Sequence, residues 1–442
     1  MTKSIYTLLL LFMSLFIMID NISAQRKLSL TTEQAIETGI QNSKTLHSSL
    51  MKVKYAKAKH SESISSALPS VTLTGAYRRL SYISPYSISI PGFPSIPILP
   101  SILDSYTAQA TIFQPIFTGF RMLKNIDLAD QMSNAADEDY NKDKSELVYN
   151  IKESYWNLFK ATELNKIMNE TVDQVKAHLQ DAKNLVSAGM MIQNDMLKIE
   201  VQLSDITLKQ IDADNAVKLS MVAFSSLIGI DLNTQIEIAS GMQYIDSEYK
   251  DLDKLIEEAI DKRAEIKSAD YRIKASEAGV TIAESSWYPQ ISLVGDYYYS
   301  KPNQRIFPSR NQFDATWDAG VNVSINVWNW LTTAHQTEQA QTQLSQSVDA
   351  MGIIKDGITL EVTQNYLSFN QAKRRIDVSE LGVKQADENM RNIEDKFKNG
   401  LATSTDVVDA ETALNTAKVS YTNALVDYEL AKAKLNKSIA KY

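Results

Sequence analysis

The 442-residue sequence has no cysteine, so disulfide bonds and thiolate ligands cannot stabilise its fold, and no N-terminal cysteine is present to carry a lipid anchor. Histidine is also scarce. The four histidines, His47, His60, His178 and His335, are scattered without the spacing of a metal site. The sequence also lacks a glycine-rich phosphate loop and a nucleophile motif. We therefore expect no catalytic residues, no cofactor and no metal site.

Clusters of positive charge are missing as well. The formal net charge is -8, and the lysines and arginines are interspersed with acidic residues along the whole chain. A protein that binds nucleic acid needs grouped basic side chains to neutralise phosphates. We expect no nucleic acid partner.

Long hydrophobic runs are limited to one, at residues 5–19. Lys3 precedes this run and the small residues Ser23 and Ala24 follow it, which is the pattern of a secretory signal peptide over residues 1–24. The run is shorter than the roughly 20 residues that a membrane-spanning helix needs. No later stretch approaches that length, so helices are excluded as the element that spans a membrane.

Proline is confined to two zones. All ten prolines fall within residues 69–115 or 289–308, and the stretches 116–288 and 309–442 contain none. Proline interrupts helices and removes a hydrogen-bond donor from central strands. The proline-free stretches can therefore hold uninterrupted helices, and the two zones hold other structure.

Inside these zones and directly after them, apolar and polar residues alternate with a period of two, which predicts strands with one apolar face. The predicted strands cover about 71–83, 107–118, 290–300 and 313–328. Between the first two lies a loop, 84–105, that is rich in proline and isoleucine. Its apolar content suggests either a lid or a surface that meets a partner.

Elsewhere the period is helical. Residues from Val407 to Leu435 place apolar or small side chains at alternating steps of three and four, which is a heptad seam. The predicted long helices cover about 120–188, 192–228, 331–398 and 403–440. A helix of about 69 residues is roughly 100 Å long at 1.5 Å per residue. Helices of that length must pack side by side.

The chain repeats itself at an offset of 211 residues, so that Gly189 and Asp195 recur as Gly400 and Asp406. A repeat of this length indicates the duplication of a structural unit in the order helix, strand, strand, helix, helix. We assign residues 25–230 to the first repeat, 231–252 to a linker and equatorial region, and 253–442 to the second repeat.

Four amphipathic strands cannot close an outer-membrane barrel, because such barrels have at least about eight strands and an open edge in hydrocarbon is costly. We therefore expect an oligomer, with three chains favoured and two or four still allowed. Aromatic residues near the strand ends are candidates for the girdles that contact lipid headgroups. These residues are Tyr77, Tyr82, Phe113, Phe117, Tyr297, Trp317, Trp328 and Trp330.

Over nearly the whole mature chain, the sequence resembles the TolC family of outer membrane efflux proteins. The resemblance is carried by the repeated order of elements, the strand entries at Leu68-Pro69 and Tyr288-Pro289, the stretch 114–119 that closes a strand, and the paired glycine-to-aspartate turns. It implies an α+β membrane protein. In that fold, a trimeric 12-stranded outer-membrane β-barrel, with four strands per protomer, continues into a long periplasmic α-helical coiled-coil barrel.

The resemblance also implies functional residues. Asp406 and Asp409 match the aspartates that constrict the periplasmic entrance, and Asp195 matches the equivalent position in the first repeat. The tips at which a periplasmic adaptor, or membrane fusion protein, would dock correspond to Gly189, Met190, Gly400, Leu401 and Thr403. The implied partners are two further copies of the chain, this adaptor, an inner-membrane transporter and outer-membrane lipid.

The sequence departs from the family at the tip of the second repeat. Phe397 and Ala402 stand where a tyrosine and an arginine can form a latch between helices, so a latch of that kind is not expected. The implied function is a passive channel in a tripartite efflux or type I secretion system. The alternative is a periplasmic adaptor-like or structural coiled-coil protein, since such proteins also contain long heptad hairpins.

Overall fold

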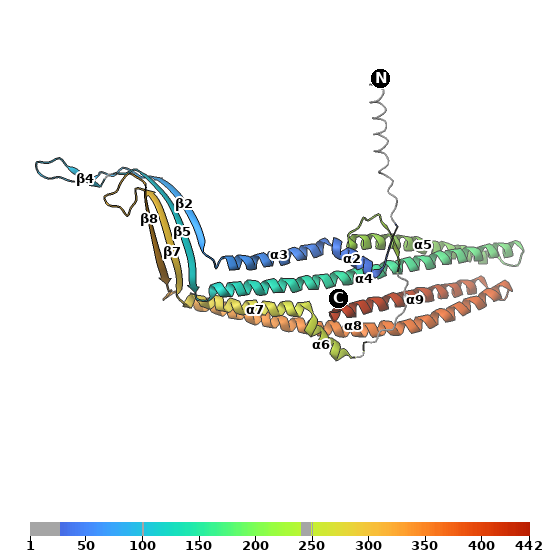
Figure 1. Ribbon diagram of the computed structural model, residues 1–442. Coiled ribbons are helices and arrows are strands. Elements are labelled where there is room, and N and C mark those ends of the chain that lie inside the picture. The colour runs from blue at the N-terminus through green and yellow to red at the C-terminus, as the bar shows by residue number, and fades with distance from the viewer. Residues whose placement is uncertain (1–26, 100, 240–248, 250) are drawn as a thin grey trace, which may run out of the picture. The chain divides into compact units, whose positions relative to one another are not determined.

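The computed structural model describes residues 27–99, 101–239, 249 and 251–442. The predicted signal peptide and part of the predicted linker lie outside the described residues. Helices predominate among the described residues, and the four longest strands form one sheet (Figure 1). The chain forms two compact units. The sheet unit comprises the described residues of 50–139 and 265–354, and the helical unit comprises those of 27–49, 140–264 and 355–442. Each unit draws segments from both predicted repeats.

The sheet unit is built on four antiparallel strands in the order β2-β5-β7-β8. Their bounds are β2 Ser70–Arg79, β5 Asp104–Thr118, β7 Gln290–Lys301 and β8 Asp314–Ser324. The central pair, β5 and β7, comes from the two different repeats. In the sheet, β2 and β8 each pair with a single neighbour and form its two edges.

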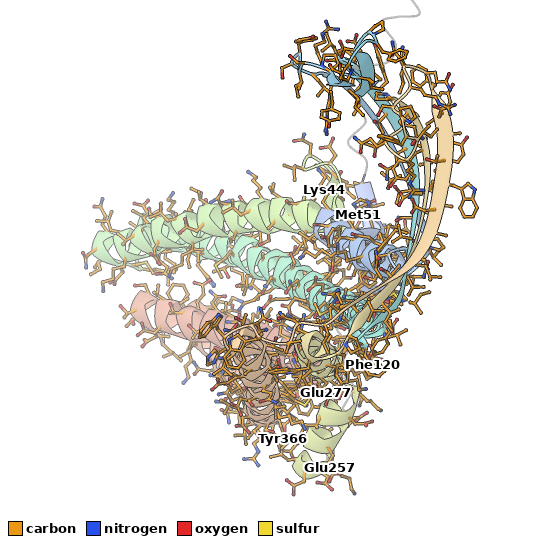
Figure 2. All side chains as sticks on the ribbon, turned by 90° about the vertical axis from the view of Figure 1, so that its left-hand side faces the viewer. Lys44, Met51, Phe120, Glu257, Glu277 and Tyr366 are labelled. Atoms are coloured by element: carbon orange, nitrogen blue, oxygen red, sulfur yellow. The ribbon has the colours of Figure 1, made fainter. Side chains whose placement is uncertain are left out.

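One face of this sheet is apolar. The register places Leu73 opposite Ala110, Ala110 opposite Tyr297, and Tyr297 opposite Trp317. These residues lie on one face because side chains alternate along a strand. The face is uncovered in a single chain, where 72% of Trp317 is exposed. Side chains project from both surfaces of the sheet (Figure 2).

Two strands are shorter than the alternation predicts. The strands expected to reach residues 83 and 328 end at Arg79 and Ser324. Ser324 pairs with Gln290, the first residue of β7, and β5 likewise begins opposite Arg79. The apolar alternation continues further, but the neighbouring strand does not, and a strand needs a partner for its backbone groups.

The proline of β5 lies where the ladder is interrupted. Pairing of β5 with β2 ends at Phe113, before the proline, and the register between β5 and β7 shifts between Pro115 and Phe117. Because proline has no N–H to donate, an irregularity of this kind is where a central strand tolerates it. Beyond the other end of β2 and β5, the predicted loop 84–105 forms a small hairpin of β3 Tyr86–Ile88 and β4 Ile96–Leu99.

Long helices connect the strands. They are α3 Lys44–Ser65, α4 Arg121–Ser187, α5 Gln193–Ile228, α7 Ala264–Glu284, α8 Thr332–Lys398 and α9 Ser404–Ser438. Every position of the seam predicted from Val407 to Leu435 is buried or half-buried, whereas Thr416 and Lys434 between them are exposed. The corresponding positions in α5 are also at least half-buried, which confirms the heptad packing in both hairpins.

The helical unit also contains a parallel pair of short strands, β1 Lys27–Leu30 and β6 Gln235–Ile238, with α2 Thr32–Asn42 and α6 Leu252–Lys262. Tyr155 of α4 is fully buried beside this pair, and its hydroxyl donates to the Leu30 carbonyl at 3.1 Å. Phe224 of α5 packs on the Tyr155 ring at 5.9 Å between centroids. This core fixes α4 and α5 to the short strands.

None of the helices among the described residues combines the length and the low polarity that crossing a membrane requires.

Candidate functional site

The two helical hairpins turn with the same backbone geometry. Gly189 follows α4 with φ 72°, and Gly400 follows α8 with φ 69°. In each turn the residue after the glycine donates its N–H to the carbonyl five residues earlier, at 2.9 Å for Met190 and 2.8 Å for Leu401. This is a Schellman cap, and it needs the left-handed conformation that glycine adopts without strain.

These turns stand clear of the rest of the chain. Met190 is 76% exposed and Leu401 is 77% exposed. A Cβ placed on Gly189 or Gly400 would meet no atom within 4 Å. The predicted docking residues therefore form two exposed apolar tips that another protein can reach.

A capping box holds the start of α9. Thr403 donates its N–H to the Asp406 carboxylate at 2.8 Å, and Thr403 Oγ1 accepts from the Asp406 N–H at 3.2 Å. Hydrogen bonds from the backbone and hydroxyl of Thr403 hold the pKa of Asp406 below its usual value. The Asp406 side chain is exposed, but its carboxylate already accepts hydrogen bonds from Thr403 at the helix start. The Thr-x-x-Asp spacing in the sequence is a signal from which this box could be predicted.

The start of α5 lacks a cap of this kind. Ile192 stands where α9 has Thr403, and it gives no side-chain hydrogen bond. Asp195, the counterpart of Asp406, instead pairs with Lys198 at 3.1 Å. Lys198 also contacts Thr405 Oγ1 at 3.4 Å and so links the beginnings of α5 and α9.

Asp409 lies one turn beyond Asp406 on α9, and its side chain is exposed. Near it, Phe397 is buried against Val407 and Ala410, with Ala402 packed on the same cluster. The two positions that depart from the family pattern therefore contribute apolar packing.

Aromatic residues gather at both ends of the sheet. At the end away from the connecting helices, the Tyr77 and Tyr106 rings lie 4.9 Å apart, and Phe313 contacts both Tyr106 and Tyr299. At the other end, Phe120 packs edge-on against Phe117 at 5.4 Å and Tyr288 at 5.7 Å. Of these, Tyr106, Phe120, Tyr288, Tyr299 and Phe313 were not among the predicted girdle residues.

The other predicted aromatic residues differ in position. Phe113 pairs with Ser70 and Val294, which places it on the face opposite Tyr297. Tyr82, Trp328 and Trp330 lie beyond the strand ends, where Trp328 and Trp330 form an edge-on pair at 5.7 Å. The alternation in the sequence continues past the strand ends and through the bulge. It therefore could not show which aromatic residues lie on the apolar face, which on the opposite face and which beyond the strands.

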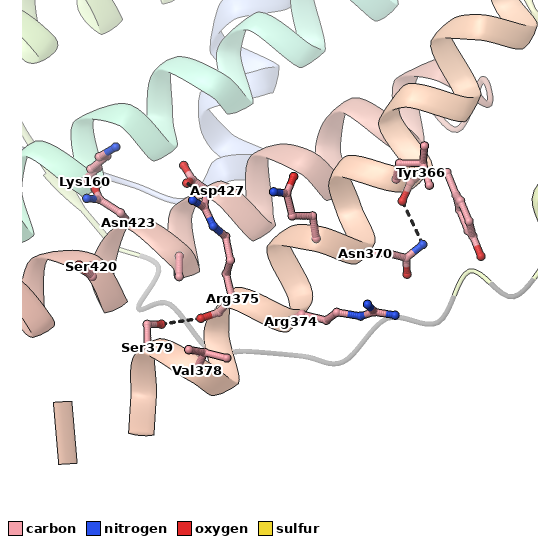
Figure 3. Close-up of a pocket in the computed structure, with 13 residues that line it drawn as sticks. Lys160, Tyr366, Asn370, Arg374, Arg375, Val378, Ser379, Ser420, Asn423 and Asp427 are labelled. Atoms are coloured by element: carbon pink, nitrogen blue, oxygen red, sulfur yellow. Dashed lines mark hydrogen bonds and ion pairs between the residues drawn. The ribbon is translucent and has the colours of Figure 1, made fainter. Parts of the chain in front are cut away.

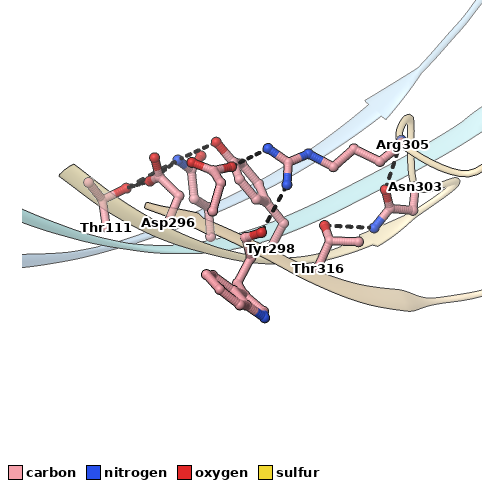
Figure 4. Close-up of polar contacts among 9 residues, drawn as sticks. Thr111, Asp296, Tyr298, Asn303, Arg305 and Thr316 are labelled. Atoms are coloured by element: carbon pink, nitrogen blue, oxygen red, sulfur yellow. Dashed lines mark hydrogen bonds and ion pairs between the residues drawn. The ribbon is translucent and has the colours of Figure 1, made fainter. Parts of the chain in front are cut away.

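The second face of the sheet carries a polar network (Figure 4). Asp296 accepts from Gln109 at 2.8 Å and from Thr111 at 2.5 Å. Arg305, from the loop after β7, donates to the Trp317 carbonyl at 3.0 Å and pairs with Asp318. The network binds neighbouring strands together and fastens this loop to the sheet.

A groove of about 1020 Å³ lies in the helical unit and is lined by Lys160, Arg374, Arg375 and Asp427 among others (Figure 3). Its two serine hydroxyls bond to carbonyls of their own helices, Ser379 to Arg375 at 2.8 Å and Ser420 to Thr416 at 2.7 Å. They are therefore not arranged as nucleophiles. The described residues contain no cluster of three metal-binding side chains.

A family model for outer membrane efflux proteins matches residues 35–230 and 255–441, which is most of the chain. The chain belongs to the outer membrane efflux protein family. It is 19% identical over 326 residues to the outer membrane efflux protein BepC of Brucella suis biovar 1, covering 74% of this chain and 70% of BepC.

Solved structures show the same fold. A membrane protein from Pseudomonas aeruginosa matches with a TM-score of 0.78 and 14% identity over 92% of this chain and 93% of that one. The outer membrane protein VceC of Vibrio cholerae matches with a TM-score of 0.77 and 16% identity over 92% and 95%. These likenesses confirm the α+β fold class.

Family membership decides between the two functional interpretations of the sequence. The chain is a channel component of an efflux system in the outer membrane, with its helical tunnel in the periplasm. It is not a periplasmic adaptor or a structural coiled-coil protein. Several solved structures that it resembles are described as outer membrane channels.

Proposed function

We propose that three copies of the chain form one continuous duct, a 12-stranded barrel in the outer membrane followed by a helical tunnel. The observation that carries this proposal is a four-stranded sheet with an exposed apolar face and two edges. Unpaired edges are costly in hydrocarbon, and closure with neighbouring copies removes them. Secretion to the membrane would use residues 1–24 as a signal peptide.

The spacing of the aromatic clusters supports this arrangement. Tyr106 and Phe117 belong to opposite clusters on β5 and are separated by about 37 Å along the strand at about 3.4 Å per residue. With a tilt of about 40°, that length spans a height of about 28 Å, close to the apolar band of about 25 Å in outer-membrane barrels. The polar network of Asp296 and Arg305 would then line the interior.

The exposed tips at Met190 and Leu401 are the proposed docking surface for the adaptor, which links the duct to an inner-membrane transporter. Their apolar side chains can be buried in a contact, and the Schellman turns present them rigidly. Because the duct carries no energy-converting site of its own in this proposal, substrates pass through it passively. The same tips fit either a tripartite efflux system or a type I secretion system.

The gate is assigned to acidic rings at the start of α9. Threefold symmetry would repeat Asp406 and Asp409 around the axis and stack their carboxylates. Asp409 is the stronger candidate, since Asp406 is held by Thr403 and Asp195 is paired with Lys198. A ring of carboxylates attracts cations and restricts the opening.

Single-channel recording of the purified full-length protein in planar bilayers tests this function. We expect Asp406→Ala combined with Asp409→Ala to raise conductance and abolish block by a multivalent cation. Asp409→Ala alone should produce most of the change, and Asp195→Ala little. Native mass spectrometry should give three copies. A monomer in detergent, or unchanged conductance of the double variant, would overturn the trimer or the gate respectively.

A further inference from the structure

A buried carboxyl lies on α9 beside the proposed gate. Glu411 is only 2% exposed, although it is the 211-residue counterpart of Glu200, whose side chain is 40% exposed and lies 3.9 Å from Lys183. A carboxyl so buried is unusual unless it is paired. The two repeats therefore place the same residue type in opposite environments.

The surroundings of Glu411 offer few hydrogen bonds to offset the burial of its carboxyl. Within the part of the chain that the structure describes, Glu411 Oε1 has no hydrogen-bond partner, and neither has Nδ2 of Asn415 one turn further along. Asn415 Oδ1 accepts a hydrogen bond from Thr171 of α4 at 2.7 Å, and that bond is buried. A polar patch thus lies between α4 and α9, where the seam is otherwise apolar.

The neighbouring helices bring charges of both signs. The negative charge of Glu394 on α8 repels an ionised Glu411, and His178 of α4 lies 3.8 Å from Glu394. Lys198 of α5 contacts Thr405 at the beginning of α9. Burial, followed by repulsion from Glu394, raises the pKa of Glu411 to about 7.

Building on the proposed gate, we propose that Glu411 is a positioning residue whose proton controls how tightly α9 packs against α4 and α8. The uncharged carboxyl fits the buried patch. An ionised carboxylate there would lack a partner and be repelled by Glu394, so its formation loosens the start of α9. That segment carries Asp406 and Asp409. Its loosening widens the opening that the copies of these aspartates surround on the threefold axis.

The direction of the effect follows from the raised pKa. A carboxyl whose pKa is raised in the folded state stabilises the packed form at low pH. This contribution to stability falls as the pH rises from the ordinary pKa of 4.5 to the raised pKa of about 7. The packed, narrow form of the tip is therefore favoured in acid. Conductance should increase as the pH passes through about 7.

The test compares wild-type protein, Glu411→Gln and the matched control Glu200→Gln. Each full-length protein is recorded in planar bilayers at about pH 5.5 and about pH 8.5, which bracket the titration. Glu411→Gln mimics the uncharged form and is expected to fold and to lose the pH dependence, with low conductance at both values. Glu200→Gln should keep the wild-type response.

Hydrogen exchange of the amides in residues 404–415 provides a second measurement that does not need conduction. At the higher pH these amides should exchange more slowly in Glu411→Gln than in wild type, and equally at the lower pH. If Glu411→Gln keeps the wild-type pH response in both measurements, or Glu200→Gln abolishes it, the role of Glu411 is overturned. Absent conductance in every protein, with the exchange difference intact, would reject the channel gate and retain the proton effect.

Discussion

The two helical hairpins have the same backbone turn but different side-chain chemistry. Gly189 and Gly400 adopt nearly equal left-handed φ angles, and both turns close with the same pair of hydrogen bonds. Beyond the turn they diverge, since α9 begins with the Thr403 and Asp406 capping box and α5 begins at an uncapped Ile192. The repeated geometry is set by glycine, whereas the local stability of each helix start depends on its own residues.

The hairpins also differ in how they bury their seams. Leu414, Val407 and Ala410 of α9 are buried with Phe397 of α8. In α5, Leu203 is only partly buried beside Ile199 and Ile206. Within one chain, the second hairpin is therefore the more completely packed.

The largest expected effect comes from the seam. Leu414→Ala should cost about 2–5 kcal/mol, because it removes buried methyl groups and leaves a cavity. Leu203→Ala, at the matching position of α5, should cost clearly less, because its side chain is already partly exposed. Native-state hydrogen exchange of each hairpin measures the local free energy of opening.

An equal cost for both substitutions would break the comparison. It would mean that Leu203 is covered by another protomer in the assembly, so that burial in one chain understates its packing. Val201→Ala provides a control on α5, since Val201 is 71% exposed. If this control cost as much as Leu203→Ala, that face of α5 would also be covered.

A smaller effect is expected from the helix caps. Thr403→Ala should destabilise the first turn of α9 by about 1 kcal/mol, because it removes the hydroxyl that accepts from the Asp406 N–H and donates to the Asp406 carboxylate. Ile192→Thr should stabilise the first turn of α5 by up to about the same amount, because it recreates Thr-x-x-Asp with Asp195. Ile192 is exposed, so its replacement sacrifices little packing.

Hydrogen exchange of the first-turn amides in α5 and α9 measures both changes. If Ile192→Thr leaves α5 unchanged, Asp195 prefers its pairing with Lys198 over the cap. The variant Ile192→Thr with Lys198→Ala tests this explanation. Without Lys198, Asp195 is free to form the cap, and the first turn of α5 should then become more stable.

Much of the fold was accessible from the sequence, because its strongest signals are periodic. The heptad steps from Val407 and the alternation around Trp317 identified helices and strands, and the family match confirmed the fold class. Strand ends were less accessible. Ile325 and Val327 continue the alternation of β8, but β7 begins at Gln290, which already pairs with Ser324, so β7 has no residue left to pair with them.

The chemistry of the site was less predictable than its location. The aspartates and glycines of the tips follow from the repeat, and their roles in gating and docking stay predictions. The burial of Glu411 could not be inferred, because the repeat gives Glu200 and Glu411 the same position in the heptad pattern. Only packing of α4 and α8 around α9 distinguishes them.

The smallest effect concerns the titration of Asp406. Its pKa is lowered by hydrogen bonds from Thr403, so the cap contributes stability above the ordinary value of 3.8 and loses that contribution as pH falls through the folded-state pKa. In Thr403→Ala the pKa of Asp406 should rise only part of the way toward 3.8, because the hydroxyl hydrogen bond is lost while the larger contribution, from the backbone N–H at position 403, remains. Carbon NMR of labelled aspartate carboxyls can follow this rise. An unchanged Asp406 titration would show that the Thr403 hydroxyl does not hold the Asp406 carboxylate in solution, and the side-chain difference between the starts of α9 and α5 would then be smaller than the structure indicates.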